Sequence, residues 1–324
     1  MGIAFPLFYL LNISFIVWWL FRRKRLYAAL SFIAVVLCWG IAQRHMQFKR
    51  PQKQENCAVE SGVKILSYNV HIFKTMPEAD YRNSYDTVLG FLNNESADII
   101  CLQEFKTYKR WENGNEEAVL KGLSNTSNAH IEYGRTSTVA KYGLATFSSF
   151  PIVGKGSIPF EESINASIYT DIAINTDTVR VYNLHLQSIR LKKNNYEFMD
   201  SIFYINSERM LQLRDMSSRM RYAYKIRAKQ VDKVAEHIKQ SPYKVIVCGD
   251  FNDTPVSYAY QRLRNGLKDS FIEAGSGIGT TYNGEFPAVR IDYIFTDKSI
   301  EAKWLKTLNY KISDHYPLVG CFEF

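Results

Sequence analysis

The chain of 324 residues is long enough for one large domain with accessory segments, and its hydrophobic share of 46% suffices for a sizeable buried core. The net charge of +8 is concentrated near the N-terminus. Residues 1–55 contain eight Lys or Arg and one Glu, a balance of +7, which leaves +1 for residues 56–324. Because the larger part is almost neutral, its overall charge gives no argument for a nucleic-acid-binding domain.

Two apolar stretches open the chain, at residues 3–21 and 26–42, with the basic run RRKR between them. Each is near the lower limit for a helix that crosses ~30 Å of hydrocarbon at ~1.5 Å per residue. We therefore predict a transmembrane helical hairpin over residues 1–42, bound to the lipid bilayer through residues 3–42. A cleaved signal peptide and a buried core helix are the alternatives. In a signal peptide the basic residues precede the apolar run, whereas here they follow it.

The orientation of the hairpin depends on which basic cluster stays inside. RRKR inside would leave both termini and the following domain outside. The segment after the second stretch is comparably basic, with Arg44, Lys49, Arg50 and Lys53. We expect the extracytoplasmic placement, because RRKR is compact and abuts both stretches.

Residues 43–62 are polar and lack periodicity, which predicts a linker. The cysteines form no C-x-x-C or Cys/His spacing typical of zinc. Cys38 lies in an apolar stretch, and Cys101 and Cys248 lie in apolar runs typical of central strands. We expect free thiols, with an oxidised pair left open.

From Val63 onward, short β-rich runs alternate with helical stretches. The predicted strands are residues 63–70, 97–105, 143–153, 167–174, 178–186, 243–248 and 290–295, followed by a C-terminal strand. Helices are predicted at 81–94 and at about 195–240. This order indicates an α/β domain with two packed sheets flanked by helices.

Polar residues recur where these apolar strands end, a position from which side chains can face one shared cleft. They are Asn69, Gln103, Glu104, His185, Asp250, Asn252, Asp292, Asp314 and His315. Any one of them alone is more often a turn or cap residue. The ordered set is what indicates a site.

The segments SYNV, LQEF, NLHL, GDFND, RIDYIF and SDHYP resemble, in this order, the signature segments of the endonuclease/exonuclease/phosphatase superfamily. The resemblance covers residues 63–324 and implies the pancreatic deoxyribonuclease-like fold. That fold is a four-layered α-β-β-α sandwich with two mostly antiparallel central sheets. It also implies a metal-dependent hydrolase that acts on phosphoric ester bonds.

The resemblance further implies roles for the strand-end residues. The implied metal ligands are Glu104, Asn69 and Asp314, holding Mg²⁺ with Mn²⁺ as an alternative. The implied catalytic residues are His185, Asp250, Asn252, Asp292 and His315. In this scheme Asp250 and Asn252 position the attacking water, and Asp292 orients His315, which acts either as a base or as a cationic phosphate clamp.

Three further residues are candidates for substrate binding, each with a plainer alternative. His71 follows the first motif and could line the cleft, or be an ordinary strand or surface residue. Arg290 could contact a phosphate or pair with an acid. Tyr282 could wall the pocket or serve packing alone.

Residues 190–233 form an insertion with eleven Lys or Arg against five Asp or Glu. Met210, Leu213, Met216, Met220 and Tyr224 recur at helical spacing, which predicts an amphipathic helix with a basic polar face. Three interpretations remain open: a solvated helix packed on the domain, a groove for a phosphate backbone, or a surface against anionic lipid.

Together these patterns predict a membrane-anchored, magnesium-dependent phosphoesterase, with a nuclease-like phosphodiesterase preferred. A phospholipid or phosphoinositide phosphoesterase is the alternative within the superfamily, because fold does not fix substrate. A catalytically inactive, membrane-tethered binding protein is the alternative of another class, although none of the signature residues is missing. No protein partner is evident.

Overall fold

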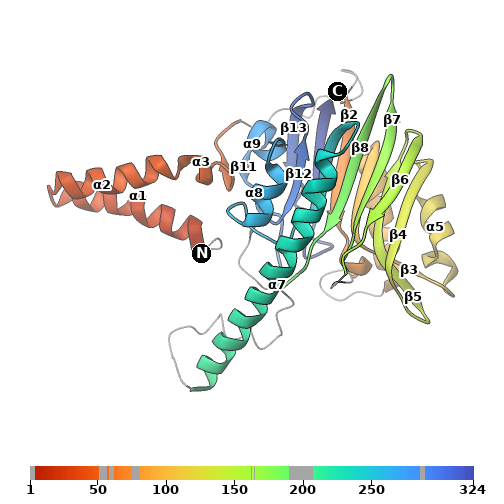
Figure 1. The fold of residues 1–324 in the computed structure, drawn as a ribbon, viewed down its shortest axis with the longest axis horizontal. Coiled ribbons are helices and arrows are strands. Elements are labelled where there is room, and N and C mark those ends of the chain that lie inside the picture. Colours follow the sequence, from red (N-terminus) through yellow and green to blue (C-terminus); the bar gives the residue numbers. More distant parts are fainter. Residues whose placement is uncertain are drawn as a thin grey trace.

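The computed structural model describes residues 4–50, 57, 62–74, 81–161, 163, 165–189, 207–284 and 289–324. Two six-stranded sheets face each other, helices cover their outer faces, and a helical hairpin projects from one end (Figure 1).

The first sheet has the strand order β13-β14-β2-β3-β5-β4. Its strands are β13 (Glu301–Thr307), β14 (Leu318–Glu323), β2 (Val63–Asn69), β3 (Ile99–Tyr108), β5 (Ala140–Ser148) and β4 (Asn128–Thr136). Only the central pair, β2 and β3, is parallel.

The second sheet repeats this plan with the order β10-β12-β9-β8-β7-β6. Its strands are β10 (Lys268–Asp269), β12 (Asp292–Thr296), β9 (Lys244–Asp250), β8 (Asp177–His185), β7 (Ser167–Ile174) and β6 (Ile152–Ile158). Here β8 and β9 are the parallel pair. The prediction of two mostly antiparallel sheets in an α/β fold is confirmed.

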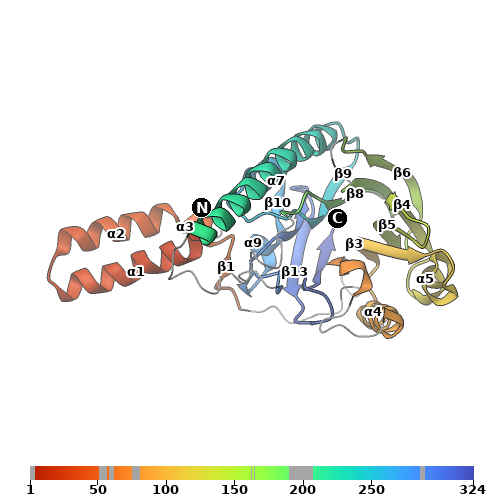
Figure 2. The ribbon, with the colours of Figure 1, turned by 90° about the horizontal axis from the view of Figure 1, so that it is seen from below.

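The outer layers are helical, as Figure 2 shows from a second side. The helices are α4 (Tyr81–Glu95), α5 (Glu116–Gly122), α7 (Ser207–Lys239), α8 (Tyr258–Arg264) and α9 (Ser270–Ala274), with 3₁₀ turns η3 (His71–Phe73) and η4 (Glu112–Gly114). The α4 residues Tyr85, Val88 and Leu92 share one face and are buried in the core cluster of the first sheet. Val231 and Val234 of α7 are likewise buried, in the core cluster of the second sheet. Burying such side chains contributes roughly 1.5–3 kcal/mol each.

Between the sheets lies an apolar core that also contains buried polar side chains. Gln103 Nε2 donates to Asn183 Oδ1 at 2.7 Å, and Asn183 Nδ2 donates to Ala145 O at 3.0 Å. Both amide side chains are fully buried, and these bonds join the sheets. Gln103, at a predicted strand end, therefore serves the interior of the sandwich.

The N-terminal segment forms the predicted helical hairpin, with α1 (Phe5–Phe21) and α2 (Arg25–Leu37) followed by the short α3 (Trp39–Ala42). The two long helices lie side by side and project away from the sheets in both views (Figure 1, Figure 2). Within the described part of the chain, no helix combines the length and apolarity needed to cross a membrane. The transmembrane part of the prediction is thus unsupported: the 17 residues of α1 extend about 26 Å, and the second helix ends at Leu37 rather than Ala42.

The start of the predicted linker at 43–62 contacts the domain. The short strand β1 (Met46–Gln47) pairs with β11 (Gly277–Ile278), Arg44 Nη1 donates to Pro255 O at 3.1 Å, and Gly279 N donates to His45 O at 3.0 Å. The rest of the linker, apart from Cys57 and Gly62, lies outside the described residues.

A disulfide joins Cys57 to Cys321, so the expectation that all thiols are free is wrong for these two residues. The two cysteines are 264 residues apart, and they meet because β14, which carries Cys321, pairs with β2 at the entry to the domain. Cys38, Cys101 and Cys248 are free.

Candidate active site

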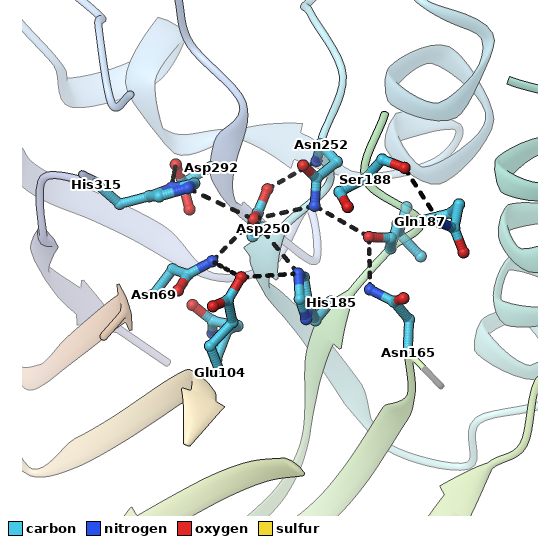
Figure 3. A network of polar contacts seen from close by, with 12 residues as sticks. Asn69, Glu104, Asn165, His185, Gln187, Ser188, Asp250, Asn252, Asp292 and His315 are labelled. Atoms are coloured by element: carbon cyan, nitrogen blue, oxygen red, sulfur yellow. Dashed lines mark hydrogen bonds and ion pairs between the residues drawn. The ribbon is translucent and has the colours of Figure 1, made fainter. Parts of the chain in front are cut away.

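Strand register assembles the site at one edge of the sandwich, where both parallel pairs end. In the second sheet His185 is paired with Asp250, and Asp250 is paired with Asp292 on its other side. In the first sheet Asn69 ends β2, and Glu104 follows the residue opposite it on β3. Figure 3 shows these five side chains converging with His315.

Asp250 lies at the centre of this group and is 1% exposed. It accepts hydrogen bonds from Asn69 Nδ2 at 3.0 Å and from Asn252 N at 2.7 Å. The preceding Gly249 has φ of 139°, and a Cβ there would lie 2.1 Å from Leu184 O, so glycine is required. Burial raises the pKa of Asp250 to about 6, although the nearby His315 and His185 act to lower it.

Glu104 reaches the site through a β-bulge. The β3–β5 register shifts between Leu102 and Phe105, and Glu104 has φ of 50°. A bulge of this kind turns a side chain that the regular pleat would aim elsewhere. Its Oε1 lies 3.4 Å from Asn69 Nδ2, and a third of the side chain is exposed to the cleft.

His315 and Asp292 form a buried pair, with Nδ1 and Oδ2 2.9 Å apart. Burial alone would lower the pKa of His315, but the carboxylates of Asp292, Asp250 and Asp314 outweigh it and raise this pKa to about 10. The imidazole is therefore a cation at neutral pH. The hydroxyl of Ser313 holds the loop by donating to Asn69 O at 2.8 Å.

His185 contributes an imidazole nitrogen that makes no hydrogen bond to the described residues. Its Nε2 is buried, 3.6 Å from Glu104 Oε1 and 3.7 Å from Asp250 Oδ2. These distances are too long for hydrogen bonds. Two carboxylate oxygens and a buried imidazole nitrogen thus converge without a hydrogen bond to that nitrogen, and these donor types can bind a cation.

Two places in the site have the chemistry to hold a metal ion. Asp250, Asp292 and His315 offer ligand atoms within 4.8 Å of one another. However, His315 Nδ1 already lies 2.9 Å from Asp292 Oδ2, an arrangement that suits an ion pair between these two residues. Glu104 offers a carboxylate beside His185 Nε2, which makes no hydrogen bond to the described residues, and its donor type fits a hard cation.

The other two predicted metal ligands are turned differently. Asn69 Oδ1 accepts from His71 N at 3.0 Å, and its amide nitrogen faces the carboxylates, so Asn69 orients Glu104 and Asp250. Asp314 Oδ1 lies 2.6 Å from His71 Nδ1. This contact raises the pKa of His71, and it helps to lower that of Asp314 against the effect of burial.

Asn252 turns back toward the site through a left-handed backbone with φ of 51°. Its Nδ2 donates to Leu186 O at 3.0 Å and to Asp250 Oδ2 at 3.1 Å. Asn165 Nδ2 donates to the same Leu186 carbonyl at 2.9 Å. The loops after β8 and β9 are therefore fixed to each other.

Arg227 of α7 supports both loops from behind, a role that the sequence analysis missed. It is 1% exposed, and its Nη1 donates to Gln187 O at 3.0 Å and also to Asn252 O. Its Nε lies 3.2 Å from Asp253 Oδ2. A clue in the sequence is that Arg227 follows Ala223 and Ile226 on the apolar face of the helix, where a charge needs a partner.

The three candidate substrate contacts fall into different places. His71 lies at the site, bound to Asp314. The ring of Tyr282 meets that of His315 edge-on, with ring centres 5.2 Å apart. Arg290 is 3% exposed, paired with Asp269 at 2.9 Å and stacked over Phe271, so its charge is used inside the domain.

Comparisons with known proteins agree with this geometry. A sequence model of the endonuclease/exonuclease/phosphatase family matches residues 66–315, and a model of a domain of unknown function matches residues 1–45. No curated protein matches the chain.

Solved structures share the fold at low identity. A family protein from Leptotrichia buccalis has 18% identity and a TM-score of 0.57, over 81% of this chain and 100% of that one. A mannosyl-6-phosphatase from Bacteroides thetaiotaomicron has 16% identity and a TM-score of 0.55, over 81% and 100%. Truncated TDP2 from Caenorhabditis elegans has 20% identity and a TM-score of 0.53, over 81% and 98%. At these identities the likeness concerns the fold.

The family match spans well over half of the chain, and it includes every residue of the site from Asn69 to His315. The chain therefore belongs to the endonuclease/exonuclease/phosphatase family.

Proposed function

We propose that this chain is a metal-dependent phosphodiesterase that cleaves its substrate by attack of an activated water. Members of its family are generally hydrolases of phosphoester bonds. The observation that carries the proposal is the convergence of Glu104, Asp250 and His185, with His315 Nε2 3.7 Å from Asp250 Oδ2.

Glu104 would hold the cation, with Asn69 fixing its carboxylate, while Asp314 is bound to His71. Mg²⁺ fits this oxygen-rich set, and Mn²⁺ is the alternative. When bound, such an ion supplies Lewis-acid neutralisation of the phosphate and of the departing oxygen.

Asp250 is the general base in this proposal. Its pKa of about 6 lies near neutral pH, where a carboxylate can accept a proton from water and still be mostly ionised. The water oxygen bonds to phosphorus, its proton passes to Asp250, and the bond from phosphorus to the alcohol oxygen breaks. Asn252 orients the base through two hydrogen bonds. His315, as a cation, clamps a phosphate oxygen.

The hairpin is proposed to bind the chain to a lipid bilayer. Leu7, Phe8 and Trp18 are 60%, 58% and 56% exposed, and α1 buries none of its residues in the protein. An apolar surface this large normally has a partner. The Cys57–Cys321 disulfide supports an extracytoplasmic catalytic domain, because disulfides persist mainly in oxidising compartments.

Vesicle flotation tests the bilayer proposal. The full chain is expected to float with lipid vesicles, and a Phe8→Glu/Trp18→Glu variant is expected to stay at the bottom. Val153→Glu is the matched control, since Val153 is 60% exposed on β6. Equal flotation of parent and hairpin variant would contradict the proposal.

A substrate panel tests the chemistry. The full chain in detergent is offered DNA, RNA, sphingomyelin, phosphoinositides and a chromogenic diester, with Mg²⁺ or with chelator. Glu104→Ala and His315→Ala should each lose turnover, whereas Glu117→Ala on exposed α5 should not. If both site variants matched the parent, this site would not carry the activity and the proposal would fail. Turnover of lipids alone would establish the second candidate, a phospholipid phosphoesterase, which the exposed hairpin favours.

A further inference from the structure

A pocket of about 400 Å³ opens directly beside Glu104 and His185, which both line it. Arg135, Tyr142 and Leu144 line the pocket together with these two residues. This volume is at the lower end of the ~300–1,000 Å³ typical of ligand pockets. The pocket can therefore hold a group of the substrate next to the reacting phosphate.

Two β-bulges build this pocket around one residue of β5. In β3 the bulge lies between Leu102 and Phe105, and regular pairing with β5 begins again where Phe105 faces Gly143. In β4 the bulge lies between Tyr133, which faces the same Gly143 on its other side, and Arg135. A Cβ on Gly143 would lie 1.8 Å from Glu132 O, so only glycine lets the strands approach. Bulges recur next to active sites because they redirect side chains. Here one directs Glu104 inward and the other leaves Arg135 exposed at the rim.

The lining combines apolar side chains with one basic residue, Arg135, and one acidic residue, Glu104. Tyr142 is half-buried, Leu144 and Ile72 are apolar, and Arg135 Cζ lies 5.9 Å from the centre of the Tyr142 ring. Lys106 Nζ approaches the same ring at 5.5 Å. Among the described residues that line the pocket, Arg135 is the only Lys or Arg.

This composition distinguishes between ligand classes. A headgroup with several phosphates would need several converging cations. For a sugar, the Asn165 amide is already engaged, since it donates to Leu186 O and accepts from Ser163 Oγ. An aromatic ring beside one arginine suits a flat base with one neighbouring phosphate.

We propose that this pocket binds one nucleotide unit of a single-stranded nucleic acid, with its base stacked on Tyr142 and the adjacent phosphate bound by Arg135. The inference rests on the proposed phosphodiesterase function and names its substrate class. The unpartnered, buried Nε2 of His185 lies between this pocket and Asp250, where the scissile phosphate would be placed. A base inside a duplex cannot enter, so single strands are preferred.

The experiment compares a single-stranded oligothymidine with an equally long oligomer that carries no bases, using the full chain in detergent with Mg²⁺. The parent should cleave the base-bearing strand with the higher kcat/KM. Tyr142→Ala should reduce that kcat/KM by about 5- to 150-fold, the range for loss of one base–aromatic stack, and leave the abasic oligomer unaffected. Tyr142→Phe should retain the parent's preference. Arg135→Ala should raise KM on both and flatten the dependence on salt.

Lys141→Ala is the matched control, because Lys141 precedes Tyr142 on β5, points to the other face and lies 3.6 Å from Glu116. Binding of the same fluorescent oligomers in EDTA gives a readout that needs no turnover. If the parent cleaves diesters but treats the two oligomers alike, the pocket inference is wrong and the phosphodiesterase proposal stands. If no diester is cleaved, the proposed function fails. The pocket inference is then tested only by whether the parent binds the base-bearing oligomer more tightly than the abasic one in EDTA. Stronger competition by an inositol bisphosphate than by a thymidine dinucleotide would also overturn the nucleotide assignment.

Discussion

Replacing Arg227 with Met should lower both stability and turnover, because this buried guanidinium holds two loops of the site from behind. Methionine fills a similar volume but donates no hydrogen bond to Gln187 O or Asn252 O. It also leaves Asp253, which is 8% exposed, without its cation. Removing one partner of a buried ion pair costs about 3–5 kcal/mol. Urea denaturation of parent and variant measures this loss.

Turnover should fall roughly 100-fold with little change in KM, the factor expected when a catalytic group moves by ~1 Å. Adding Asp253→Asn removes the unpaired carboxylate, so the double variant should regain stability without regaining turnover. Arg262→Met is the control, because its pair with Asp232 is partly exposed and worth only about 0–1 kcal/mol. Parental kcat in folded Arg227→Met would refute the positioning role.

Three other predictions concern the metal, acid stability and the disulfide. Glu104→Gln should weaken Mg²⁺ binding in calorimetry and lower kcat at least 100-fold; unchanged binding would place the ion elsewhere. Burial and Lys155 lower the pKa of His130 to about 4, so its neutral form contributes stability in full above pH ~6.5 and loses it as the pH falls toward 4. His130→Gln should flatten denaturation midpoints across that window, and an unchanged slope would contradict this. Cys57→Ser should lower the free energy of unfolding by up to about 5 kcal/mol for a loop of this length, whereas Cys38→Ser should leave it unchanged.

The sheet framework could be predicted because strand period and buried apolar runs are local signals. The interval predicted at 167–174 is β7 itself, and that at 178–186 differs from β8 by one residue at each end. The gathering of Asn69 and Asp250 at one edge followed from their places at strand ends, whereas Glu104 lies within β3 and reaches the site through a bulge. These features depend on neighbours in sequence, which the sequence displays directly.

The side-chain contacts that the sequence did not predict are made with partners distant in sequence. The pairing of Arg290 with Asp269 became visible only once β10 and β12 were side by side. The amide orientation of Asn69 is set by a backbone N–H two residues on and by carboxylates from other strands. Arg227 was one of eleven basic residues in its segment, and only burial separates it from the solvated ones.

The disulfide between Cys57 and Cys321 changes the covalent topology of the domain. The bond closes a ring that contains almost every residue from the linker to the last strand. A single cut of the backbone anywhere between these cysteines would leave one covalent piece, since both fragments remain attached through sulfur. Such a nicked protein would migrate as two fragments only after reduction. The domain could therefore survive a single proteolytic cut at a surface loop with both halves of its active site held together.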